Sequence, residues 1–450
     1  MPSRPDLKAA LGRGDAVLAA RDRSVPLAAL AEGNPLSVRP AELKGANVLI
    51  RTRAQLPAAL ALAALDGFAR RLVIAPPDLK EEYLDDVVAQ AGIDALVSEV
   101  SDVAGLRTVR ASTVLEAGTG ERGTVESEWI LFTSGTTGRP KMAAHALAAL
   151  AGAIAPRPDQ GEKIVWGTFY DIRRYGGLQI LLRALLGGAS LILSDAEETA
   201  GDFLVRLSQH GVTHLTGTPS HWRRALMSPA IGRIAPRYVR LSGEIADQAV
   251  LDGLKAQFPE AAIGHAYAST EAGVGFEVTD GLEGFPADFV GREGPVEMRV
   301  MEGALHIRSP RTAHGYIGGA GAKGDDGWVD TGDMVERRGG RYYFAGRRDG
   351  VINVGGLKIN PEEVEAVINR HPGVALSRVS GRKNPITGAI IVAEVVLDSG
   401  AGTAANDNAF VREALLAFCR ANLPAFKVPA MVRFVEKLEL TPAGKLARHG

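Results

Sequence analysis

Short apolar runs alternate with longer helix-forming stretches in the first third of the chain. Residues 48–50 and 72–75 are apolar runs of strand length, and the Ala- and Leu-rich residues 54–68 between them have the composition of a helix. A second helix-forming stretch at 79–91 and an apolar run at 95–97 continue the alternation. Because a strand–helix–strand order favours a right-handed parallel crossover, the pattern predicts a parallel α/β layer.

The middle of the chain continues this alternation with clearer stop signals. The apolar residues 128–132 predict a buried strand, and the helix formers at 142–151 predict a helix soon after it. Residues 178–186 are rich in leucine and predict a helix that two glycines end at 187–188. The first 45 residues are instead polar, irregular and rich in proline, so we expect a loosely packed arm there.

Two further segments carry local structural signals. Residues 212–222 predict a strand followed by a helix, with Ser220 as the N-cap and His221 as a surface or packing residue rather than a base. After residue 350, apolar residues on both sides of a Gly-Gly pair predict two strands with a tight turn. The apolar spacing at 411–419 places Cys419 on the buried face of a helix, which indicates a core residue and not a nucleophile.

Composition and charge narrow the class of protein. The chain has 450 residues, enough for two or three domains, and 46% of them are hydrophobic, which is typical of globular proteins. Lys plus Arg number 51 and Asp plus Glu 52, a net charge of −1 that favours neither nucleic acid nor an anionic membrane. We find no membrane span and no signal-peptide core, and a single cysteine predicts a reducing, cytoplasmic setting.

The strongest candidate for ligand chemistry is the loop at 131–141, Leu-Phe-Thr-Ser-Gly-Thr-Thr-Gly-Arg-Pro-Lys. Its glycines allow a close backbone approach to an anion, and its hydroxyls and cations add donors and positive charge. The spacing is not that of a Walker A motif. Two Gly-x-Gly-x-x-Gly matches, at 118–123 and 319–324, do not lie between a strand and a helix and are interpreted as loops.

This loop resembles the signature of the adenylate-forming superfamily, which includes acyl- and aryl-CoA synthetases, peptide-synthetase adenylation domains and firefly luciferase. Other segments resemble its motifs in the same order: Tyr-Ala-Ser-Thr-Glu at 267–271, Thr-Gly-Asp at 331–333, the segment 346–356 and Pro-Ala-Gly-Lys at 442–445. Ala268 stands where the superfamily usually has glycine. The resemblance extends from about residue 48 to the C-terminus, and the N-terminal region looks trimmed relative to the superfamily.

The resemblance implies a nucleotide site. It assigns the departing phosphates to Thr133, Ser134, Gly135, Thr136, Thr137, Gly138 and Lys141. It assigns the adenosine to Ser242, Gly243, Glu244, Ala266, Tyr267, Ala268, Asp333 and Arg347. Among these, the Tyr267 ring is suited to stack on adenine and the Asp333 carboxylate to accept from both ribose hydroxyls.

The resemblance also implies the catalytic groups. Thr270 donates to the α-phosphate, and Glu271 is a hard oxygen ligand for Mg²⁺. The turn at 441–444 has proline second and glycine fourth, and it presents Lys445 as the catalytic lysine. Lys445 would bridge the substrate carboxylate and the α-phosphate.

A fold of class α/β follows, with two domains. The resemblance implies a large AMP-binding domain of layered α/β subdomains at 1–346 and a small mobile α+β domain at 347–450. Asp349 stands at the hinge position, where one residue absorbs the change in domain orientation. Gly356, which lets a pantetheine arm pass, and Lys358 belong to the segment that enters the site for thioester formation.

The acid-binding wall is expected near residues 169–175, and two interpretations stay open. The candidates for the wall are Phe169, Tyr170, Asp171 and Tyr175. In one interpretation, Arg173 and its neighbour Arg174 are surface charges at the start of a helix. In the other, Arg173 or Asp171 meets a polar substrate.

The predicted function is an ATP-dependent carboxylic acid–CoA ligase that uses ATP, Mg²⁺ and CoA. An alternative is an amino-acid or aryl-acid adenylating enzyme that loads a carrier-protein phosphopantetheine. A luciferase-like oxidase and a non-catalytic nucleotide-binding protein are further alternatives. A small carboxylic acid is the expected partner, while an acyl-carrier protein and a homodimer remain open.

Overall fold

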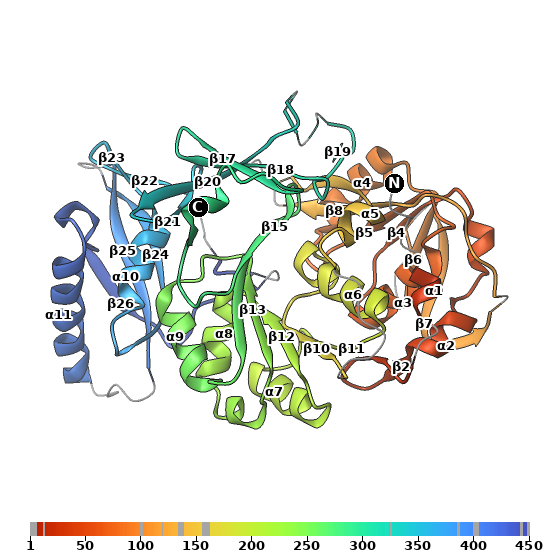
Figure 1. Ribbon diagram of the computed structural model, residues 1–450, viewed down its shortest axis with the longest axis horizontal. Coiled ribbons are helices and arrows are strands. Elements are labelled where there is room, and N and C mark those ends of the chain that lie inside the picture. The colour runs from red at the N-terminus through yellow and green to blue at the C-terminus, as the bar shows by residue number, and fades with distance from the viewer. Residues whose placement is uncertain are drawn as a thin grey trace.

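The computed structural model describes residues 7–11, 14–99, 102–103, 105–118, 120–133, 139–154, 163–319, 321, 323–324, 326–384, 388–398, 405–441 and 444–447. Figure 1 shows two large sheets side by side, with a smaller sheet above them and the C-terminal elements at one end of the long axis. The fold is mixed α/β, with a large N-terminal domain and a smaller C-terminal one, as predicted.

The N-terminal sheet is built on parallel strands. In spatial order it contains β19 (Gly315–Tyr316), β9 (Lys141–Ala146), β8 (Glu128–Thr133), β5 (Arg71–Ile74), β4 (Asn47–Ile50), β6 (Ala95–Ser98), β7 (Arg107–Ala117) and β3 (Gly33–Leu36). Strands β8, β5, β4, β6 and β7 are parallel, which confirms the predicted strand–helix–strand layer. Helix α3 (Gln55–Leu65) connects β4 to β5 and is buried along its whole length, which explains its uniformly apolar sequence.

The second large sheet carries most of the candidate site. In spatial order it contains β15 (Gly273–Val278), β14 (Ala262–Ser269), β13 (Tyr238–Ser242), β12 (His214–Gly217), β10 (Val165–Thr168), β11 (Ser190–Leu193), β1 (Val17–Ala19) and β2 (Ser24–Pro26). Strands β14, β13, β12, β10, β11 and β1 are parallel. Their carboxyl ends therefore meet at one edge, where ligands of open α/β sheets usually bind.

Helices cover both large sheets. They are α1 (Leu7–Leu11), α2 (Leu27–Glu32), α4 (Leu84–Ala91), α5 (Leu147–Ala151), α6 (Tyr175–Gly187), α7 (Ala200–Gln209), α8 (Pro219–Leu226) and α9 (Gln248–Gln257). Short 3₁₀ turns are η1 (Pro40–Leu43), η2 (Glu81–Tyr83), η3 (Pro229–Arg233) and η4 (Ala287–Phe289). Helix α6 ends where Gly188 adopts φ +59°, as the glycine pair predicted.

A third, antiparallel sheet leads to the C-terminal domain. It contains β16 (Phe285–Pro286), β21 (Arg341–Arg347), β20 (Val329–Arg338), β18 (Ala304–Arg308) and β17 (Glu297–Met301). Beyond it come the hairpin β22 (Ile352–Val354) and β23 (Leu357–Ile359), helices α10 (Pro361–Ile368) and α11 (Ala405–Asn422), turn η5 (Ala425–Lys427), and the sheet of β24 (Val374–Asn384), β25 (Gly388–Leu397) and β26 (Met431–Phe434).

The C-terminal elements pack around their own hydrophobic core. Buried residues from Ile352 to Val432 form a cluster that includes no residue of the large domain among those described. Cys419 is fully buried in it, and burial raises the pKa of its thiol to about 11. This confirms the interpretation of Cys419 as a core residue. A separate core gives this domain the internal cohesion that movement as a unit requires.

Two expectations about local structure within the first 151 residues are wrong. Residues 141–146 form strand β9, and only Leu147–Ala151 is helical, because antiparallel pairing with β8 overrides helix propensity. The N-terminal segment is not a loose arm: β1 pairs with β11, and the side chains of Leu18 and Leu27 are completely buried. Its widely spaced leucines supply core contacts that the polar composition concealed.

Candidate active site

The β8–β9 hairpin places two predicted phosphate ligands next to each other. Thr133 ends β8 and Lys141 begins β9, and the two residues are Cα partners in the antiparallel pair. The Lys141 ammonium lies 5.3 Å from the ring centroid of Tyr316 on β19. Five other predicted phosphate ligands lie outside the described residues: Ser134, Gly135, Thr136, Thr137 and Gly138.

Tyr316 connects this hairpin to the second motif. Its hydroxyl donates to Glu271 Oε1 at 3.0 Å and also interacts with Thr133. Burial and then the Glu271 carboxylate raise the pKa of Tyr316, so the phenol stays a neutral donor. Thr270 and Glu271 lie in the turn directly after β14. Tyr316 is a member of the site that the sequence patterns did not reveal.

Glu271 fits the proposed metal role as a single hard ligand. No group of three or more His, Cys, Asp or Glu side chains suited to a metal is found within the described residues. A Mg²⁺ ion here would therefore depend on Glu271 together with phosphate oxygens and water, which is a common arrangement for this ion. The hydrogen bond from Tyr316 fixes the orientation of this carboxylate.

The predicted ribose ligand is held by two neighbours. Tyr267 donates its hydroxyl to Asp333 Oδ2 at 2.6 Å, and Arg347 Nη1 lies 3.3 Å from Asp333 Oδ1. Burial raises the pKa of Asp333, while Tyr267 and Arg347 oppose that shift. The Tyr267 ring stacks between protein rings here, at 5.7 Å from Phe276 and 5.4 Å from Phe344. Its stacking on adenine stays a prediction.

The two segments assigned to the adenosine are neighbours in space. Ser242 and Ala266 are Cα partners of the parallel pair β13–β14, and Gly243 and Glu244 continue from the carboxyl end of β13. Gly243 has φ +87°, a conformation that favours glycine. The register thus brings Ser242–Glu244 beside 266–268 at the edge where parallel α/β sheets bind ligands.

The C-terminal turn that carries Lys445 is docked at this same edge. Thr218 donates its hydroxyl to the Gly444 carbonyl at 2.6 Å. Glu244 accepts from the Leu446 amide at 2.8 Å through one oxygen and from the Ser220 amide at 2.9 Å through the other. A Cβ on Gly243 would lie 3.5 Å from Lys445 Cε, so the lysine passes directly over that glycine.

Charged groups of the large domain and of the segment before the hinge affect the pKa of Lys445. Part of its side chain is accessible to solvent, yet the crowding by protein atoms lowers its pKa. Glu244 and Asp333 oppose that shift, whereas Arg347 and Arg174 add to it. Lys445 therefore lies within electrostatic reach of the predicted ribose ligand, although the two residues are far apart in sequence.

Further contacts hold the small domain in this orientation. Arg224 on α8 donates to the Leu438 carbonyl, and Asn369 Nδ2 lies 3.5 Å from Asp247 Oδ2. Asp247 also forms a buried ion pair with Arg223. Asn369 in turn accepts from Ser377 Oγ at 2.8 Å within the small domain. None of these docking residues has a recognisable sequence motif.

The N-cap of α8 is Thr218 and not Ser220. Thr218 Oγ1 accepts from the His221 amide at 3.1 Å and also contacts the docked turn. His221 packs against Phe169, with ring centroids 5.4 Å apart, and a Cβ on Gly444 would collide with its imidazole. Burial and then the nearby Arg224 lower the pKa of His221 to about 3. His221 is thus a neutral packing residue under the turn.

Replacing Thr218 with valine should selectively weaken adenylate formation. The substitution removes the hydroxyl that holds the Gly444 carbonyl, and one such bond contributes on the order of 1 kcal/mol. We expect acyl-adenylate formation to slow by about 5- to 10-fold. Thioester formation from supplied acyl-adenylate should change less than twofold. Thr218→Ser restores the hydroxyl and should restore the rate; equal loss in both half-reactions would point to damage from the lost N-cap instead.

A small void of about 20 Å³ lies between α6 and the strands β12–β15. Side chains from α6 and from neighbouring strands line it, among them Tyr175, Gln179, Arg183, Thr216, Arg240 and Ser242. Tyr170 also lines it and donates its hydroxyl to the Ser242 carbonyl at 2.9 Å. Because Ser242 borders both the void and the nucleotide segment, the void is the candidate acid pocket.

Two of the predicted pocket residues have other contacts. Phe169 does not line the void but packs against Phe203 and Trp222, with ring centroids at 5.2 and 5.8 Å. Asp171 forms a two-point ion pair with Arg173, at 2.9 and 2.6 Å. Phe169 is partly buried and packs against the core beside the void, and its contact with an acid substrate stays a prediction.

The structure contradicts the first interpretation for Arg173 and leaves the second, a contact with a polar substrate, as a prediction. Its side chain is only 4% exposed, so it is not a surface charge, and it also donates to the Thr52 carbonyl at 2.6 Å. It therefore joins the segment before α6 to the β4–α3 connection, and it binds both carboxylate oxygens of Asp171. Arg174 is more exposed and pairs with Asp78.

The hairpin assigned to thioester formation lies away from Lys445 in this structure. Gly355 and Gly356 form its turn with φ +57° and +88°, and Gly356 and Lys358 are exposed to solvent. Figure 1 places β22 and β23 at the outer corner of the C-terminal domain. Asp349 is exposed between β21 and β22 and accepts from Arg347 Nε at 3.1 Å.

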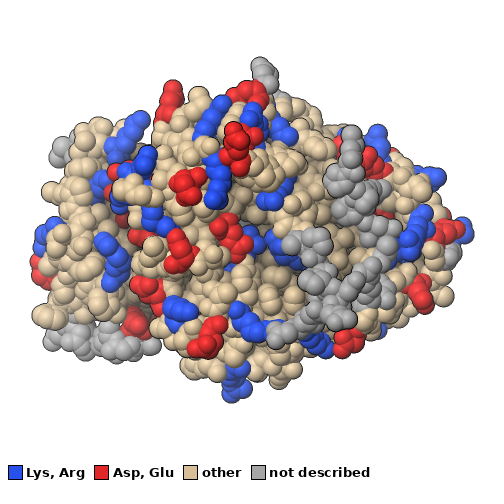
Figure 2. Space-filling view, viewed as in Figure 1, with Lys and Arg blue, Asp and Glu red and all other residues tan. Residues whose placement is uncertain are grey.

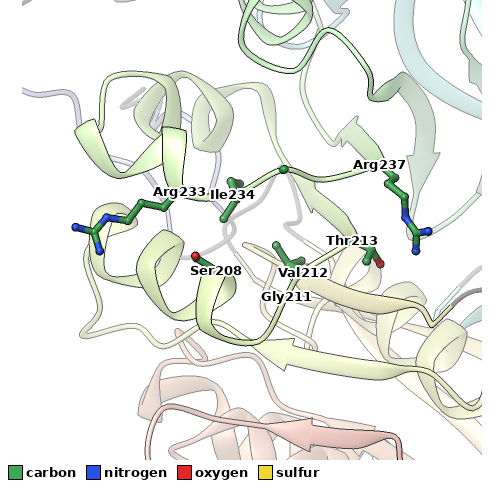
Figure 3. Close-up of a pocket in the computed structure, with 8 residues that line it drawn as sticks. Ser208, Gly211, Val212, Thr213, Arg233, Ile234 and Arg237 are labelled. Atoms are coloured by element: carbon green, nitrogen blue, oxygen red, sulfur yellow. The ribbon is translucent and has the colours of Figure 1, made fainter.

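A wider hollow of about 340 Å³ lies elsewhere, at the outer side of α7 and η3. Figure 3 shows that its two arginines, Arg233 and Arg237, point outward at opposite sides and do not converge. Figure 2 shows acidic and basic side chains interspersed over the same face as in Figure 1. Within the described residues, no helix has the length and apolar character needed to traverse a bilayer.

Comparison with protein families identifies two matching regions. A model described as AMP-binding enzyme matches residues 44–317, and one described as AMP-binding enzyme C-terminal domain matches residues 363–445. The first alone covers more than half of the chain. The two matches flank the segment that contains Asp349.

Individual relatives are similar along most of the chain. A 2-succinylbenzoate–CoA ligase of Bacillus velezensis is 28% identical over 409 residues, covering 85% of this chain and 78% of the relative. A feruloyl-CoA synthase of Amycolatopsis is 26% identical over 409 residues, covering 81% and 80%.

Solved structures share the fold. An o-succinylbenzoate CoA synthetase from Bacillus subtilis with its acyl-adenylate intermediate has a TM-score of 0.72 at 20% identity, covering 99% of this chain and 97% of that one. A benzoate CoA ligase from Burkholderia xenovorans has a TM-score of 0.78 at 21% identity and covers 98% of both.

Proposed function

The chain belongs to the AMP-binding enzyme family, and on that premise we propose that it is an ATP-dependent carboxylic acid–CoA ligase. In the first step a carboxylate attacks the α-phosphorus of ATP, which forms an acyl-adenylate and releases pyrophosphate. In the second step the CoA thiol attacks the acyl carbon, which forms the thioester and releases AMP. A cytoplasmic location is part of this proposal, since the reaction consumes ATP and CoA.

The observation that carries the proposal is the docked position of Lys445. A turn at the end of the small domain reaches Gly243 and Glu244 of the large domain, and its lysine lies within electrostatic reach of Asp333. A cation between a carboxylate pocket and a ribose ligand is placed to stabilise charge on the transferring phosphoryl group. The curated relatives, which are named as CoA ligases, support the same reaction.

The residues of this site act by positioning and charge, because the attacking carboxylate is already ionised and needs no general base. Lys445 holds carboxylate and α-phosphate oxygens together, and Thr270 donates to the same phosphate. Lys141 and the loop after Thr133 hold the departing pyrophosphate. Asp333, with Arg347 beside it, fixes the ribose so that the α-phosphorus faces the acid pocket.

Glu271 would hold Mg²⁺, which supplies positive charge to the phosphate oxygens when bound. This assignment rests on its place at the end of β14 and on the Tyr316 hydroxyl that orients it. Thr133 also contacts Tyr316, so Thr133, Tyr316 and Glu271 lie next to one another.

The second step needs a thiol where Lys445 now lies. We assign the change to a rotation near Asp349 that withdraws the C-terminal turn and brings the Gly355–Gly356 hairpin to the site. Gly356 and Lys358 would then contact the pantetheine arm and its phosphates. We keep the boundary between the domains at 346 and 347, immediately before the last residue of β21.

The ion pair of Asp171 with Arg173 favours a CoA ligase over an enzyme that loads amino acids. Both of its oxygens bind Arg173, so this acid does not point to a substrate ammonium. The test is pyrophosphate exchange across aliphatic, aryl and amino acids, followed by transfer to free CoA. Exchange stimulated only by amino acids, without CoA turnover, would favour a carrier-protein acceptor, and no exchange with any acid would overturn the proposal.

The rate of adenylate formation should fall at a lower alkaline pH than an ordinary lysine would cause. The protein atoms that crowd the Lys445 ammonium lower its pKa, although the residue is exposed to solvent, and only its protonated form carries the charge that the reaction uses. As pH rises through this lowered pKa, adenylate formation should fall at a pH below the value of about 10.4 for an ordinary lysine. Thioester formation from supplied acyl-adenylate should not show this decrease at alkaline pH. Stopped-flow measurement of both half-reactions across the pH range checks the difference.

A further inference from the structure

One face of α6 carries three buried polar atoms that have no hydrogen-bond partner within the described residues: the Tyr175 hydroxyl, Gln179 Oε1 and Arg183 Nε. Their spacing of i, i+4 and i+8 places the three side chains on the same side of the helix. Tyr175 and Gln179 are only 7% and 5% exposed. The Val274 backbone lies near the Tyr175 hydroxyl but outside hydrogen-bond geometry. Because buried polar groups are rarely left unpaired, this face of α6 is expected to hold a small polar ligand.

The orientations of two of these side chains are fixed by contacts at their other atoms. Gln179 Nε2 donates to the Leu150 carbonyl at 2.9 Å, so turning the amide round would set two oxygen atoms against each other. Arg183 Nη1 donates to the Ala153 carbonyl at 3.2 Å. Both acceptors lie at the C-terminal end of α5 or just after it. The two side chains thus tie α6 to the end of α5, and each keeps one polar atom unused.

The space available to a ligand is the void of about 20 Å³ beside α6, which all three side chains line. A cavity of about 10–15 Å³ is enough for one water molecule, which needs two to four polar partners. Other polar groups of the wall are already bonded: Thr216 donates to Thr168 Oγ1 at 2.9 Å, and Tyr170 donates to the Ser242 carbonyl. The void therefore has the size and the free partners for one water molecule, and it has no room for an organic ligand.

The chemistry of the three atoms selects a neutral ligand. Arg183 Nε only donates, Gln179 Oε1 only accepts, and the Tyr175 hydroxyl does either. A halide ion has no hydrogen to donate to Gln179. A metal cation would be repelled by Arg183 and by Arg240, which also lines the void. A water molecule accepts from Arg183, donates to Gln179 and has capacity left for Tyr175.

We propose that the void of the free enzyme binds one water molecule, held by Tyr175, Gln179 and Arg183. The water satisfies the unused atoms and fixes the two side chains that tie α6 to the end of α5. It also places a hydrogen-bonding group beside Ser242 and Ala268, which line the same void. The inference does not depend on the ligase function, and its tests need no substrate.

The first test is a crystal structure of the full chain without substrate, at a resolution that orders water molecules. We expect one peak in the void, at the usual hydrogen-bond distance of about 2.7–3.2 Å from at least two of the three atoms. An empty void, or a peak that contacts fewer than two of these atoms, would overturn the inference. Crystals grown with bromide in place of chloride separate water from a bound halide, since an anomalous peak in the void would show an ion and would also overturn it.

Substitutions of the proposed partners test whether they hold the water. Tyr175→Phe removes only the hydroxyl, and Gln179→Met keeps the length of the side chain without its acceptor. In the double variant Arg183 is the last of the three partners, so we expect a dry void. Thr216→Val is the matched control, because it alters a hydroxyl of the same wall that already donates to Thr168, and the water should remain. Water at the same position in the double variant, or its loss in Thr216→Val, would contradict the assignment.

Native-state hydrogen exchange measures the same link in solution. No hydrogen bond joins the Tyr175 hydroxyl directly to Gln179 Oε1, so an energetic coupling between them needs an intermediary. Tyr175→Phe should raise the local opening constant of the α6 amides by about 5- to 10-fold, the effect of one lost hydrogen bond. In a Gln179→Met background the same change should have less than a twofold effect. Equal effects in the two backgrounds would overturn the shared water, whatever reaction the enzyme catalyses.

Discussion

Replacing Lys445 with alanine is expected to slow acyl-adenylate formation by about 10²- to 10³-fold, the range for loss of one charge-stabilising donor. The reason is its place on the docked turn, over Gly243 and within reach of Asp333. Thioester formation from supplied acyl-adenylate should stay within about threefold of the unaltered rate, because Lys445 leaves the site before that step. The measurement is single-turnover kinetics of each half-reaction.

The control for this variant is Lys437→Ala, an exposed lysine of the same domain. Both half-reactions should proceed at the normal rate in it. If Lys445→Ala slowed the two half-reactions equally, its role would be structural or would extend to the second step. That result would remove the main support for alternating use of the small domain.

Replacing Asp333 with alanine should impair both half-reactions, by about 10²-fold in kcat/KM for ATP and for acyl-adenylate. The carboxylate is partly buried and is held by Tyr267 and Arg347, and it is the group assigned to the ribose. Hydrogen bonds to a charged group contribute about 1.5–3 kcal/mol each, and the ribose is present in both steps. The expected pattern therefore differs from that of Lys445→Ala.

Two comparisons test this pattern. Asp333→Asn keeps the shape and one acceptor, so it should lose less than the alanine variant. Glu336→Ala on the same strand removes an exposed carboxylate that pairs with Arg338, and such pairs contribute little. Selective loss of the first half-reaction in Asp333→Ala would contradict the ribose assignment.

Local patterns were sufficient for much of the fold. The strands around α3 have the continuous apolar character of buried parallel strands, and the glycine pair at the end of α6 marks its C-terminus directly. Motif order also indicated Lys445 as the residue of interest. These features depend on residues close together in sequence.

The rest depends on tertiary pairing. Strand β9 has helix-forming residues, and only its antiparallel partner β8 makes it extended. Thr218 and Glu244 gain their docking role from a turn more than 200 residues later in the sequence. Arg183 and Arg240 carry no motif and line the same void only because α6 packs beside β13.

The most direct test of the account is a distance between the domains during the two steps. Spin labels at Met227→Cys and Lys437→Cys lie near the contact of Arg224 with Leu438, and the native Cys419 is buried and should not be labelled. With ATP and a non-reactive acid analogue, double electron–electron resonance spectroscopy should report a short distance between the two labels. With an acyl-adenylate analogue and CoA, it should report a longer one as the turn withdraws. The same single distance in both states would contradict the claim that Lys445 is delivered and removed by movement of the small domain.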